Sequence, residues 1–363
     1  MSTFLEKVKR NLKRVSNIAN QSGRGYIGTL WFLSKLKLSR GFILTEIHDN
    51  EIDLGSQEYV DTFLNWKEQK YYLSLLNPRF YSRIARNKYF THTMLEASGI
   101  TDKSELYLYY NAELGTLANG RTANDIASVL NILKQKSVTR CVIKTTEDSH
   151  GDNVRVVREI VYGTDDAELT LHNGKSVMLS EILGKEPLIF ESVIEQSAQM
   201  KAFNESSVNT IRFMTVLYPS GEARIIGGFM KIGRAGICVD NAGSGGNVDA
   251  GVDMTTGTLY NAMCYNRPRE CVRIERHPDS NVQVEGVMIE DWDNICSKVL
   301  SFQQSMPFVK AAGWDIAITP DGPKIIEIND MWDRIGQMFR RHGWKPEIKA
   351  CYDAWVDYYN RKN

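Results

Sequence analysis

Two acidic residues and one amide, Asp315, Glu327 and Asn329, lie near the end of the chain in a segment that predicts a β-hairpin. Alternating apolar and polar residues flank Pro320-Asp321-Gly322, which are typical turn residues. If the pairing closes around Asp321, Asp315 lies directly across from Glu327, and Asn329 lies one step along the same face. Two carboxylates held this close destabilise a sheet unless a cation lies between them. Hard oxygen ligands of this kind suit Mg²⁺, so the segment predicts a magnesium site. The plain alternative is the solvent-facing side of an ordinary edge hairpin.

The same alternation predicts the buried face of the hairpin. Trp314, Ile316 and Ile318 fall on one face of the first strand, and Ile326 and Ile328 on one face of the second. Asp315, Glu327 and Asn329 therefore share the opposite faces.

The hairpin resembles the closing segment of the ATP-grasp ligases, in which an Asp on one strand and a Glu-x-Asn on the next hold the magnesium ions of ATP. Its sequence is most similar to the sugar-transfer-associated branch of this family. The matching residues are Gly-Trp-Asp-Ile-Ala-Ile-Thr-Pro-Asp-Gly-Pro followed by Ile-Glu-Ile-Asn. The resemblance runs from Leu76 to Asn329 and implies an α+β ATP-grasp fold, in which two α+β subdomains clasp ATP. We expect a mostly helical portion over residues 1–86, a small lid subdomain with its lead-in helix over 87–192, and a core subdomain with the metal site and C-terminal helices over 193–363.

Composition sets broad limits on the function. Of 363 residues 42% are hydrophobic, and Lys+Arg and Asp+Glu number 44 each, so bulk charge gives no reason to expect nucleic-acid binding. The six cysteines show no CxxC pair and no metal-finger spacing, which is typical of reduced thiols in a cytosolic protein. No signal-peptide block or apolar run long enough for a membrane span occurs. We expect a cytoplasmic protein.

Residues 2–20 predict a basic amphipathic helix, with an apolar stripe of Phe4, Val8, Leu12 and Val15. A weak peripheral contact with anionic lipid at the inner face of the membrane is one interpretation. The other is a helix whose stripe packs on its own domain. The narrow stripe, which carries no Trp at its centre, favours packing.

The lid region is predicted from a series of local signals. Residues 87–100 predict a helix closed by Gly99. Further on we expect a strand at 106–110, a helix near 123–136 with Thr122 as its N-cap, and strands at 139–145, 154–161 and 189–194. Asn173-Gly174 predicts a tight hairpin turn.

Three features of this region suggest nucleotide contacts. Lys88 begins a helix, where a cation opposes the helix dipole, and Lys144 ends a buried-looking strand, where a charge needs a partner. The resemblance implies that both reach the phosphates of ATP. The loop with His150 and Gly151 could lay backbone N–H groups along phosphate oxygens, although it has fewer glycines than is usual in the family, and a polar hairpin turn is the alternative.

The segment from Phe190 to Gln196 resembles the linker strand between lid and core. The resemblance implies that the backbone of Glu191, Ser192 and Val193 reads the adenine edge. It also implies that Glu195 or Gln196 holds the ribose hydroxyls, and the spacing does not decide between these two.

Cations and a glycine-rich loop mark the core. Arg212, Lys231 and Arg234 would place positive charge where a transferring phosphoryl group develops negative charge. Pairing with carboxylates on the strand surface is the alternative for each, and for Arg234 the alternative is a structural pair with Asp240 or Asp249. The unit Asn209-Thr210-x-Arg212 matches the sugar-associated branch. The resemblance places Asn209 and the glycine-rich loop, with Asn241, Ser244, Gly245 and Gly246, on the acceptor side, against the alternative of a flexible solvent loop.

These residues together predict an ATP-dependent carboxylate–amine ligase that acts through an acylphosphate, with ATP and Mg²⁺ as its cofactors. The branch's link to polysaccharide building suggests an amino acid or amine coupled to a sugar-type carboxylate as small-molecule substrates. A phosphotransferase acting on a hydroxyl would need the same metal ligands and is the second hypothesis. A non-catalytic nucleotide-binding partner of a glycosyltransferase system is the third, and the intact acidic set argues against it.

Overall fold

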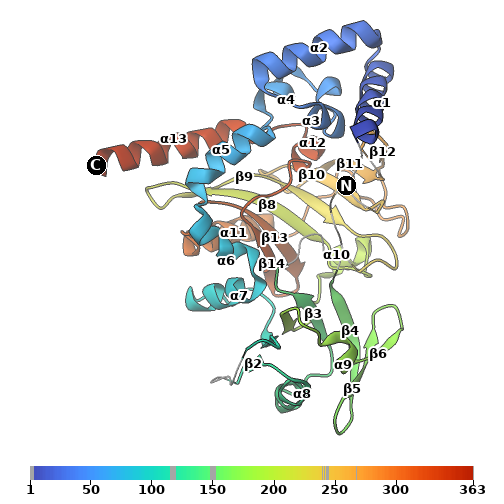
Figure 1. Ribbon diagram of the computed structural model, residues 1–363, viewed down its shortest axis with the longest axis vertical. Coiled ribbons are helices and arrows are strands. Elements are labelled where there is room, and N and C mark those ends of the chain that lie inside the picture. Colours follow the sequence, from blue (N-terminus) through green and yellow to red (C-terminus); the bar gives the residue numbers. More distant parts are fainter. Residues whose placement is uncertain are drawn as a thin grey trace.

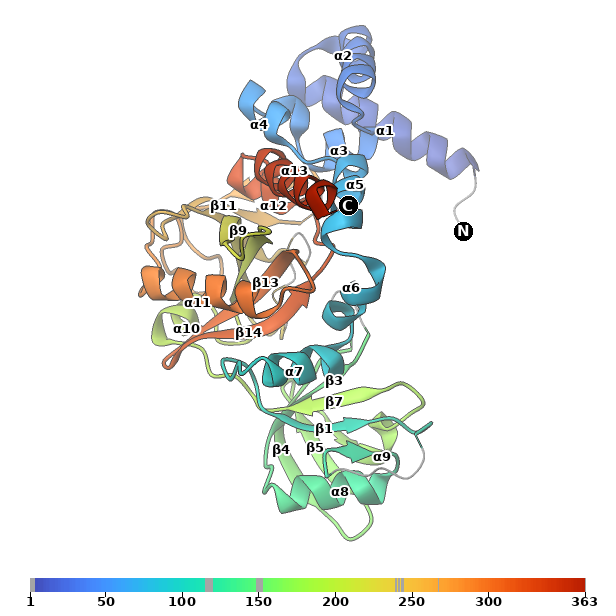
Figure 2. The same ribbon diagram turned by 90° about the vertical axis from the view of Figure 1, so that its left-hand side faces the viewer.

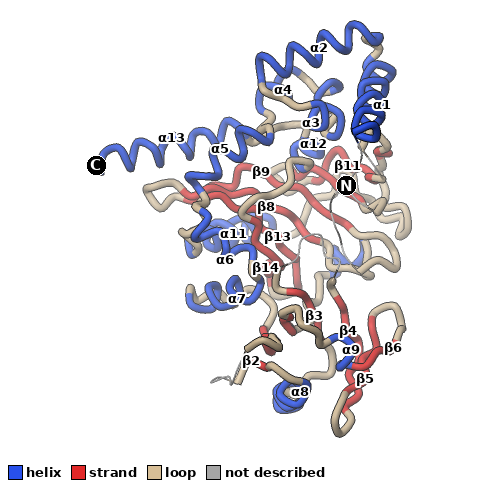
Figure 3. The backbone as a smooth tube through the Cα atoms, viewed as in Figure 1, coloured by secondary structure: helices blue, strands red, loops and turns tan. Residues whose placement is uncertain are grey.

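The computed structural model describes residues 4–114, 120–147, 153–238, 240, 242, 245–266 and 268–362. They form two β-sheets, helices packed on both, and a group of N-terminal helices at one end of the molecule (Figures 1 and 3). The predicted α+β class is confirmed. The helices are α1 (Phe4–Ser22), α2 (Gly25–Arg40), α3 (Leu44–Asp49), α4 (Gln57–Thr62), α5 (Trp66–Leu76), α6 (Arg79–Arg86), α7 (Lys88–Ala97), α8 (Ile126–Gln135), α9 (Leu179–Ile182), α10 (Ala198–Phe203), α11 (Trp292–Ser305), α12 (Gly336–Arg340), α13 (Lys345–Lys362) and the 3₁₀ turn η1 (Ile52–Leu54).

The first sheet has the strand order β2-β1-β7-β3-β4-β5-β6 and lies at the end of the molecule opposite α2 (Figures 1 and 2). Its β1–β2 pair is parallel and its other pairs are antiparallel. Apolar residues of α8 and α9 cover one face, around Leu133, Leu179 and Phe190. Its strands are β1 (Leu106–Tyr110), β2 (Thr122–Ala123), β3 (Cys141–Thr145), β4 (Arg155–Tyr162), β5 (Ala167–Leu171), β6 (Ser176–Met178) and β7 (Leu188–Glu191).

The second sheet is antiparallel throughout, with the order β12-β11-β10-β9-β8-β13-β14. Residues of α11, including Ile295 and Phe302, belong to the core on one face, and residues of α5, α12 and α13, including Phe339, belong to the core on the other. Its strands are β8 (Thr210–Leu217), β9 (Ala223–Ile232), β10 (Val248–Val252), β11 (Leu259–Tyr265), β12 (Cys271–Arg273), β13 (Ala311–Thr319) and β14 (Gly322–Asn329).

The β13–β14 hairpin closes on Pro320-Asp321, because Thr319 pairs with Gly322. The turn therefore has two residues between paired positions, one fewer than the predicted Pro320-Asp321-Gly322. A bulge between Asp315 and Ile316 restores the offset, so Asp315 still lies across from Glu327 as predicted. The bulge also changes the buried face: Ile325 and Ile328 join the core, and Ile326 instead lines the cleft between the sheets. The buried residues of β14 are therefore Ile325 and Ile328, and not the predicted pair of Ile326 and Ile328.

The N-terminal helices have a small core of their own, built around Ile18, Phe42 and Tyr59. In α1 only Val15, Ile18 and Ala19 are buried, and the first half of the helix projects away from the other elements (Figure 2). Packing of the whole apolar stripe was the favoured interpretation, and it is wrong for Phe4, Val8 and Leu12, which are exposed. Among the described residues, no helix is both long enough and apolar enough to span a bilayer.

The local signals of the lid region predict its elements well. The strand at 106–110 is confirmed, and Gly99 follows α7 with a φ of 74°. A hairpin at Asn173-Gly174 is also confirmed, but its connection has three residues, 172–174, because Leu171 N donates to Lys175 O at 2.9 Å. The helix near 123–136 begins later than predicted. Asp125, not Thr122, accepts the capping hydrogen bond from Ser128 N, and Thr122 belongs to β2.

Candidate active site

A cleft of about 1600 Å³ lies between the two sheets and extends to the N-terminal helices. Lys88 of α7 and Lys144 of β3 line it from the lid side. The predicted catalytic and metal residues of the second sheet line the other wall, apart from Arg234: they are Arg212, Lys231, Asp315, Glu327 and Asn329. One helix and five strands thus bring these side chains to one place.

Asp315 is buried, and both of its carboxylate oxygens are paired with cations. Arg212 donates from Nε to Oδ1 at 2.6 Å and from Nη2 to Oδ2 at 2.5 Å, and Lys231 Nζ lies 3.1 Å from Oδ2. β8 and β13 hold the Arg–Asp pair in register, because Asp315 and Arg212 are direct partners. Burial alone would raise the pKa of Asp315, but Arg212 and Lys231 outweigh it and lower the pKa to about 2.

A second carboxylate, Asp240, extends this charge cluster. It accepts a hydrogen bond from Thr210 Oγ1 and lies 3.5 Å from Lys231 Nζ. Burial, together with the neighbouring Asp315 carboxylate, raises the pKa of Asp240 although Lys231 opposes the shift. Sequence reasoning missed Asp240 as a site residue, and only its place at the start of the glycine-rich loop pointed to it.

Glu327 and Asn329 are less engaged than Asp315. Lys88 Nζ lies 3.7 Å from Glu327 Oε1, longer than a hydrogen bond, and a third of the Glu327 side chain is exposed. The Asn329 Nδ2 is buried without a hydrogen-bond partner among the described residues. The ligands that fit a hard divalent cation here are the oxygens of Asp315, Glu327 and the Asn329 side chain, whereas the Asn329 Nδ2 is a hydrogen-bond donor and cannot bind a cation. Within the described residues no group of three or more His, Cys, Asp or Glu side chains is placed to hold a metal ion.

Lys144 has the partner that its buried position required. Its ammonium pairs with Glu191 of β7, which also contacts His92 Nε2 at 2.9 Å and accepts a hydrogen bond from Ser104 Oγ at 2.8 Å. Burial would raise the pKa of Glu191, but Lys144 and His92 outweigh it and hold the pKa well below its usual range. The sequence signalled that Lys144 needed a partner but did not identify Glu191 or His92.

The two candidate ribose ligands, Glu195 and Gln196, lie in the linker after β7 and differ in how accessible their side chains are. Gln196 is buried, and its Nε2 donates to the carbonyls of Asn204 and Ser207 at 2.9 and 2.8 Å. Its amide is therefore engaged inside the core. Glu195 is half-exposed on the cleft wall, where its carboxylate meets Arg140 at 2.8 Å. Of the two, Glu195 has oxygens that a ligand can reach.

The backbone of the same linker joins it to the lid. Ser192 donates its N–H to Glu105 O at 2.9 Å and accepts from Glu105 N through its hydroxyl, also at 2.9 Å. Ser192 and Val193 both line the cleft. The Ser192 side chain is thus held by the backbone just before β1.

Asn209 lies in the core and does not line the cleft, contrary to its predicted substrate role. It is fully buried, and its Nδ2 donates to Asn204 O at 2.7 Å and Met200 O at 2.9 Å. Its Oδ1 accepts from Gly233 N at 3.1 Å. The amide therefore has no free group for a substrate, and it ties the start of β8 to α10 and to the end of β9.

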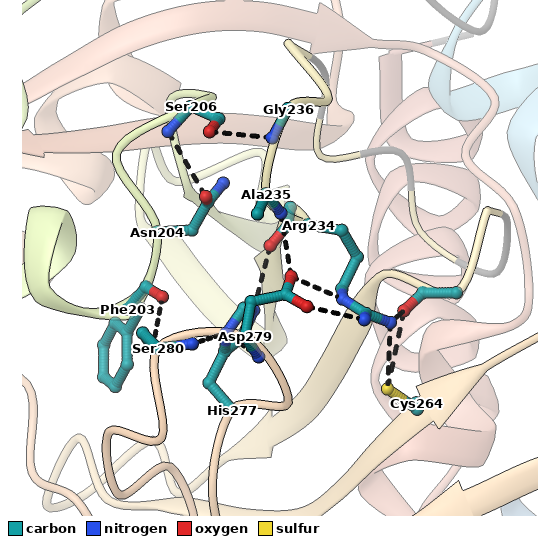
Figure 4. Close-up of polar contacts among 12 residues, drawn as sticks. Phe203, Asn204, Ser206, Arg234, Ala235, Gly236, Cys264, His277, Asp279 and Ser280 are labelled. Atoms are coloured by element: carbon teal, nitrogen blue, oxygen red, sulfur yellow. Dashed lines mark hydrogen bonds and ion pairs between the residues drawn. The ribbon is translucent and has the colours of Figure 1, made fainter.

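Arg234 also lies outside the lining of the cleft, and Figure 4 shows where it is held. Its Nε and Nη2 donate to the two oxygens of Asp279 at 2.7 Å each, and Nη1 donates to Gly246 O at 3.0 Å. The hydrogen bonds from Arg234 and Ala235 lower the pKa of Asp279 well below its usual range. This arrangement agrees with the alternative of an Arg held by a carboxylate, with Asp279 as the partner.

The remaining predicted contacts are only partly described. Gly246, with φ of 74°, lies in the turn before β10, beside Arg234, and neither it nor Gly245 lines the cleft. His150 and Gly151, predicted to contact phosphate, and Asn241 and Ser244, predicted to contact substrate, lie outside the described residues.

The far end of the cleft was not predicted as part of the site. There Glu46 of α3, Trp66 of α5 and Arg334 line the wall, and the Arg334 guanidinium lies 5.1 Å from the centre of the Trp66 ring. Glu46 accepts a hydrogen bond from Trp66 N and lies 3.4 Å from Arg334 Nε. The N-terminal helices therefore supply an aromatic ring and both signs of charge to the cleft.

Comparison with known proteins gives one match over most of the chain and several distant structural likenesses. The sequence profile described as "Sugar-transfer associated ATP-grasp" matches residues 67–352. Similar solved structures include the VanG D-Ala:D-Ser ligase from Enterococcus faecalis, with a TM-score of 0.44 and 10% identity, covering 75% of this chain and 63% of that one. N5-carboxyaminoimidazole synthase from Aspergillus clavatus gives 0.39 and 12%, covering 75% of this chain and 52% of that one.

The D-alanine–D-alanine ligase from Bacillus anthracis gives a TM-score of 0.40 at 10% identity, covering 77% of this chain and 70% of that one. This chain thus spans between half and two thirds of the length of the Aspergillus and Enterococcus structures. No curated protein matches the sequence.

Proposed function

Because this chain belongs to the sugar-transfer-associated ATP-grasp family, which matches residues 67–352, we propose that it is an ATP-dependent carboxylate–amine ligase. The observation that carries the proposal is the convergence of Lys88, Lys144, Arg212 and Lys231 on one cleft that also contains the facing carboxylates of Asp315 and Glu327. Cations from both sheets around facing carboxylates suit a polyphosphate held with a divalent metal.

The nucleotide lies between the sheets in this proposal. The backbone of Glu191, Ser192 and Val193 reads the adenine edge, and Glu195 binds the ribose hydroxyls, since the Gln196 amide is engaged elsewhere. Lys144 and Lys88 bind the phosphates from the lid side. The Glu191 carboxylate fixes the Lys144 ammonium at the cleft wall, so Lys144 meets the phosphates already oriented.

Asp315, Glu327 and Asn329 would hold Mg²⁺, whose chemistry when bound is to neutralise phosphate oxygens and orient them. The residues around this set have separate tasks. Arg212 and Lys231 hold Asp315 ionised through the pairs at 2.5–3.1 Å. They also place positive charge beside the group being transferred, where negative charge develops.

The reaction joins an acid to an amine in two displacements. A substrate carboxylate oxygen attacks the γ-phosphorus of ATP, and the bond between the γ-phosphorus and the oxygen bridging it to the β-phosphate breaks. The products of this step are an acylphosphate and ADP. The amine nitrogen then attacks the acyl carbon, inorganic phosphate leaves, and the nitrogen loses a proton. The family's association with sugar transfer favours a sugar-type carboxylate and an amino acid or amine, in the building of cell-surface polysaccharide.

The acceptor end of the cleft is then the end formed by the N-terminal helices. Trp66 offers an aromatic face for the apolar side of a ring, and Arg334, a fifth of whose side chain is exposed, offers a charged partner for polar groups. Glu46 is buried and holds Arg334 in place. This end of the cleft, with its mixed charge, replaces Arg234 and the glycine-rich loop as the proposed acceptor site.

ATP turnover over a panel of uronic acids and amino acids tests the function. The ligase releases ADP and phosphate in equal amounts and yields a product whose mass is that of both substrates less one water. Lys231→Met should abolish this turnover, and Lys349→Met, on the exposed face of α13, should not. ADP without free phosphate, with a phosphorylated hydroxyl compound, would identify a phosphotransferase and overturn the proposal.

A further inference from the structure

Helix α2 is apolar on two opposite faces. Thr29 and Leu36 are buried on the inner face, and Phe32 and Leu33 pack there against the N-terminal core. On the outer face Ile27 is 85% exposed, Trp31 68% and Leu38 86%. A helix that is apolar all round is ordinarily buried on both sides, so the outer face requires a partner.

The outer face of α2 forms a continuous stripe. With roughly 100° of rotation per residue, Ile27, Leu30, Trp31 and Leu38 fall within a sector about 100° wide. Leu30 is also exposed, at 45%. Lys35 and Lys37, both exposed, lie on either side of this stripe. An apolar stripe containing a Trp, bordered by lysines, is typical of helices that lie in a membrane interface.

Helix α1 adds a second exposed apolar surface with the same character. Phe4 is 79% exposed and Leu5 69%, and Leu12 is also exposed, although all three lie on an amphipathic helix. Lys7, Lys9, Arg10 and Lys13 occupy the remainder of its circumference. The apolar stripe of α1 therefore faces solvent beside a strongly basic surface.

Charge separates this end of the molecule from the rest. The first 40 residues contain nine basic residues and one acidic residue, Glu6, whereas the whole chain has 44 of each sign. The rest of the chain is therefore net acidic. Figures 1 and 2 both place α2 at one extreme of the longest dimension of the molecule, so a flat surface can meet it without touching the sheets.

From these observations we propose that α2, together with the first half of α1, docks the protein on an anionic phospholipid bilayer surface. Trp31, Ile27 and Leu38 insert at the level of the headgroups, and the basic residues meet the lipid phosphates. A bilayer is favoured over a protein partner because nine basic residues against one acidic residue in the first 40 match a surface of dense negative charge. The inference stands independently of the proposed ligase activity.

Vesicle sedimentation of the full chain tests the proposal. We expect binding to vesicles that contain phosphatidylglycerol, much weaker binding to pure phosphatidylcholine, and loss of binding as salt rises, since the Debye length falls from about 10 Å at 0.1 M to about 3 Å at 1 M. Trp31→Ser with Leu38→Ser should lower the partition coefficient about tenfold or more. Lys35→Glu with Lys37→Glu should lower it by more than about tenfold, because each basic residue near an anionic surface contributes about fivefold.

Two matched controls separate the surface from general effects. Lys67→Glu with Lys70→Glu makes the same charge change on the exposed side of α5, and Phe80→Ser removes an exposed aromatic ring from α6. Both should bind vesicles as the unmodified chain does, and all variants should keep the same thermal unfolding temperature. Equal binding to both vesicle types, equal loss in the controls, or no binding at low salt would overturn the proposal. So would a concentration-dependent dimer that Trp31→Ser abolishes, because it would assign the surface to a second copy of the chain.

Discussion

At the scale of single residues, Asp315 organises the charges of the cleft. Its two oxygens meet Arg212 and Lys231 at 2.5–3.1 Å, and it faces Glu327, which Lys88 approaches from the lid. The cation that two facing carboxylates require is thus supplied in part by side chains. Removing Asp315 would leave two buried cations with one counter-charge fewer.

We therefore expect Asp315→Asn and Glu327→Gln to differ in stability. Asp315→Asn should lower the free energy of unfolding by about 3 kcal/mol, because breaking a buried ion pair leaves its partners uncompensated. Glu327→Gln, at a partly exposed position with a 3.7 Å pair, should change it by less than about 1 kcal/mol. Chemical denaturation measures both, and both variants should lose ATP turnover. Equal stability of the two variants would contradict the assigned role of the Asp315 ion pairs.

Asp315 also predicts a dependence of stability on pH. Its pKa is lowered to about 2 in the folded protein, against about 3.9 in an unfolded chain, so the folded state binds fewer protons between these values. The stabilisation is present above about pH 4 and is lost as the pH falls toward 2, and it amounts to about 2.5 kcal/mol. Urea unfolding at pH 5 and pH 3 should show about half of this loss, about 1.2 kcal/mol, in the unmodified chain and in Glu327→Gln. Asp315→Asn should show a smaller loss.

At the scale of elements, the Arg234–Asp279 pair joins the loop after β9 to the loop after β12. Asp279 also accepts from Ala235 N at 2.8 Å, so a single carboxylate fixes two consecutive residues of the first loop (Figure 4). Arg234 further holds Gly246 O, at the end of the glycine-rich loop. These contacts assign Arg234 to positioning the loops.

Arg234→Ala should accordingly lower the thermal unfolding temperature. The KM for ATP and the KM for the carboxylate substrate should either both change by a similar factor or both stay the same. Asp279→Asn should have a similar effect, and the double variant should cost less than the sum, because the two residues act as a unit. Steady-state kinetics and thermal melts measure these values. A large rise in the carboxylate KM alone would return Arg234 to the acceptor site.

The elements also show what the sequence could predict. Local signals were sufficient for β1, the Asn173-Gly174 turn and the end of α7, because turn and capping residues act over a few positions. The sequence predicts the pairing of Asp315 with Glu327 correctly but the turn one residue too long, and the bulge between Asp315 and Ile316 cancels this difference. Alternation alone does not reveal a bulge, so the burial of Ile325 in place of Ile326 could not be predicted.

Ion-pair and hydrogen-bond partners that lie far apart in the chain could not be predicted from the sequence. Lys144 evidently needed a carboxylate, but Glu191, His92 and Ser104 come from three other segments. The same holds for Arg212, whose pKa is raised by Asp315 against the opposing effect of burial. Which side chains become partners depends on how the strands and sheets pack together, and a local sequence pattern does not predict that packing.

At the scale of the whole molecule, the N-terminal helices are joined to the core by buried charge. Arg269 donates to His48 O at 3.1 Å and to Gln21 Oε1 at 2.8 Å, and its guanidinium pairs with Asp53. Arg341 pairs with Glu51 at 2.7 Å. These ties hold the helices at the far end of the cleft, so a bound acceptor would meet Trp66 on a fixed wall.

The lid sheet is joined to the core more sparingly. Ile325 N of β14 donates to Asp102 O at 2.8 Å, and Lys298 Nζ of α11 lies 3.0 Å from Asp102 Oδ2. The segment before β1 is therefore held against β14, while β3 and β4 face the cleft through Lys144, Val154 and Val156. Rotation about the segment near Asp102 would move β3 and β4 toward phosphates held by the core.

We predict that this lid closes on ATP. Hydrogen exchange with a non-hydrolysable ATP analogue and Mg²⁺ should show added protection across residues 153–161 and at 144–147, because closure removes these backbone amides from solvent. β5 and β6 lie farther along the sheet from β3, so they serve as an internal reference that should change little. Lys144→Met should reduce the protection at 144–161 by weakening the pull of the phosphates on the lid. Unchanged exchange across 153–161 at saturating nucleotide would show that the lid does not close, whatever the turnover.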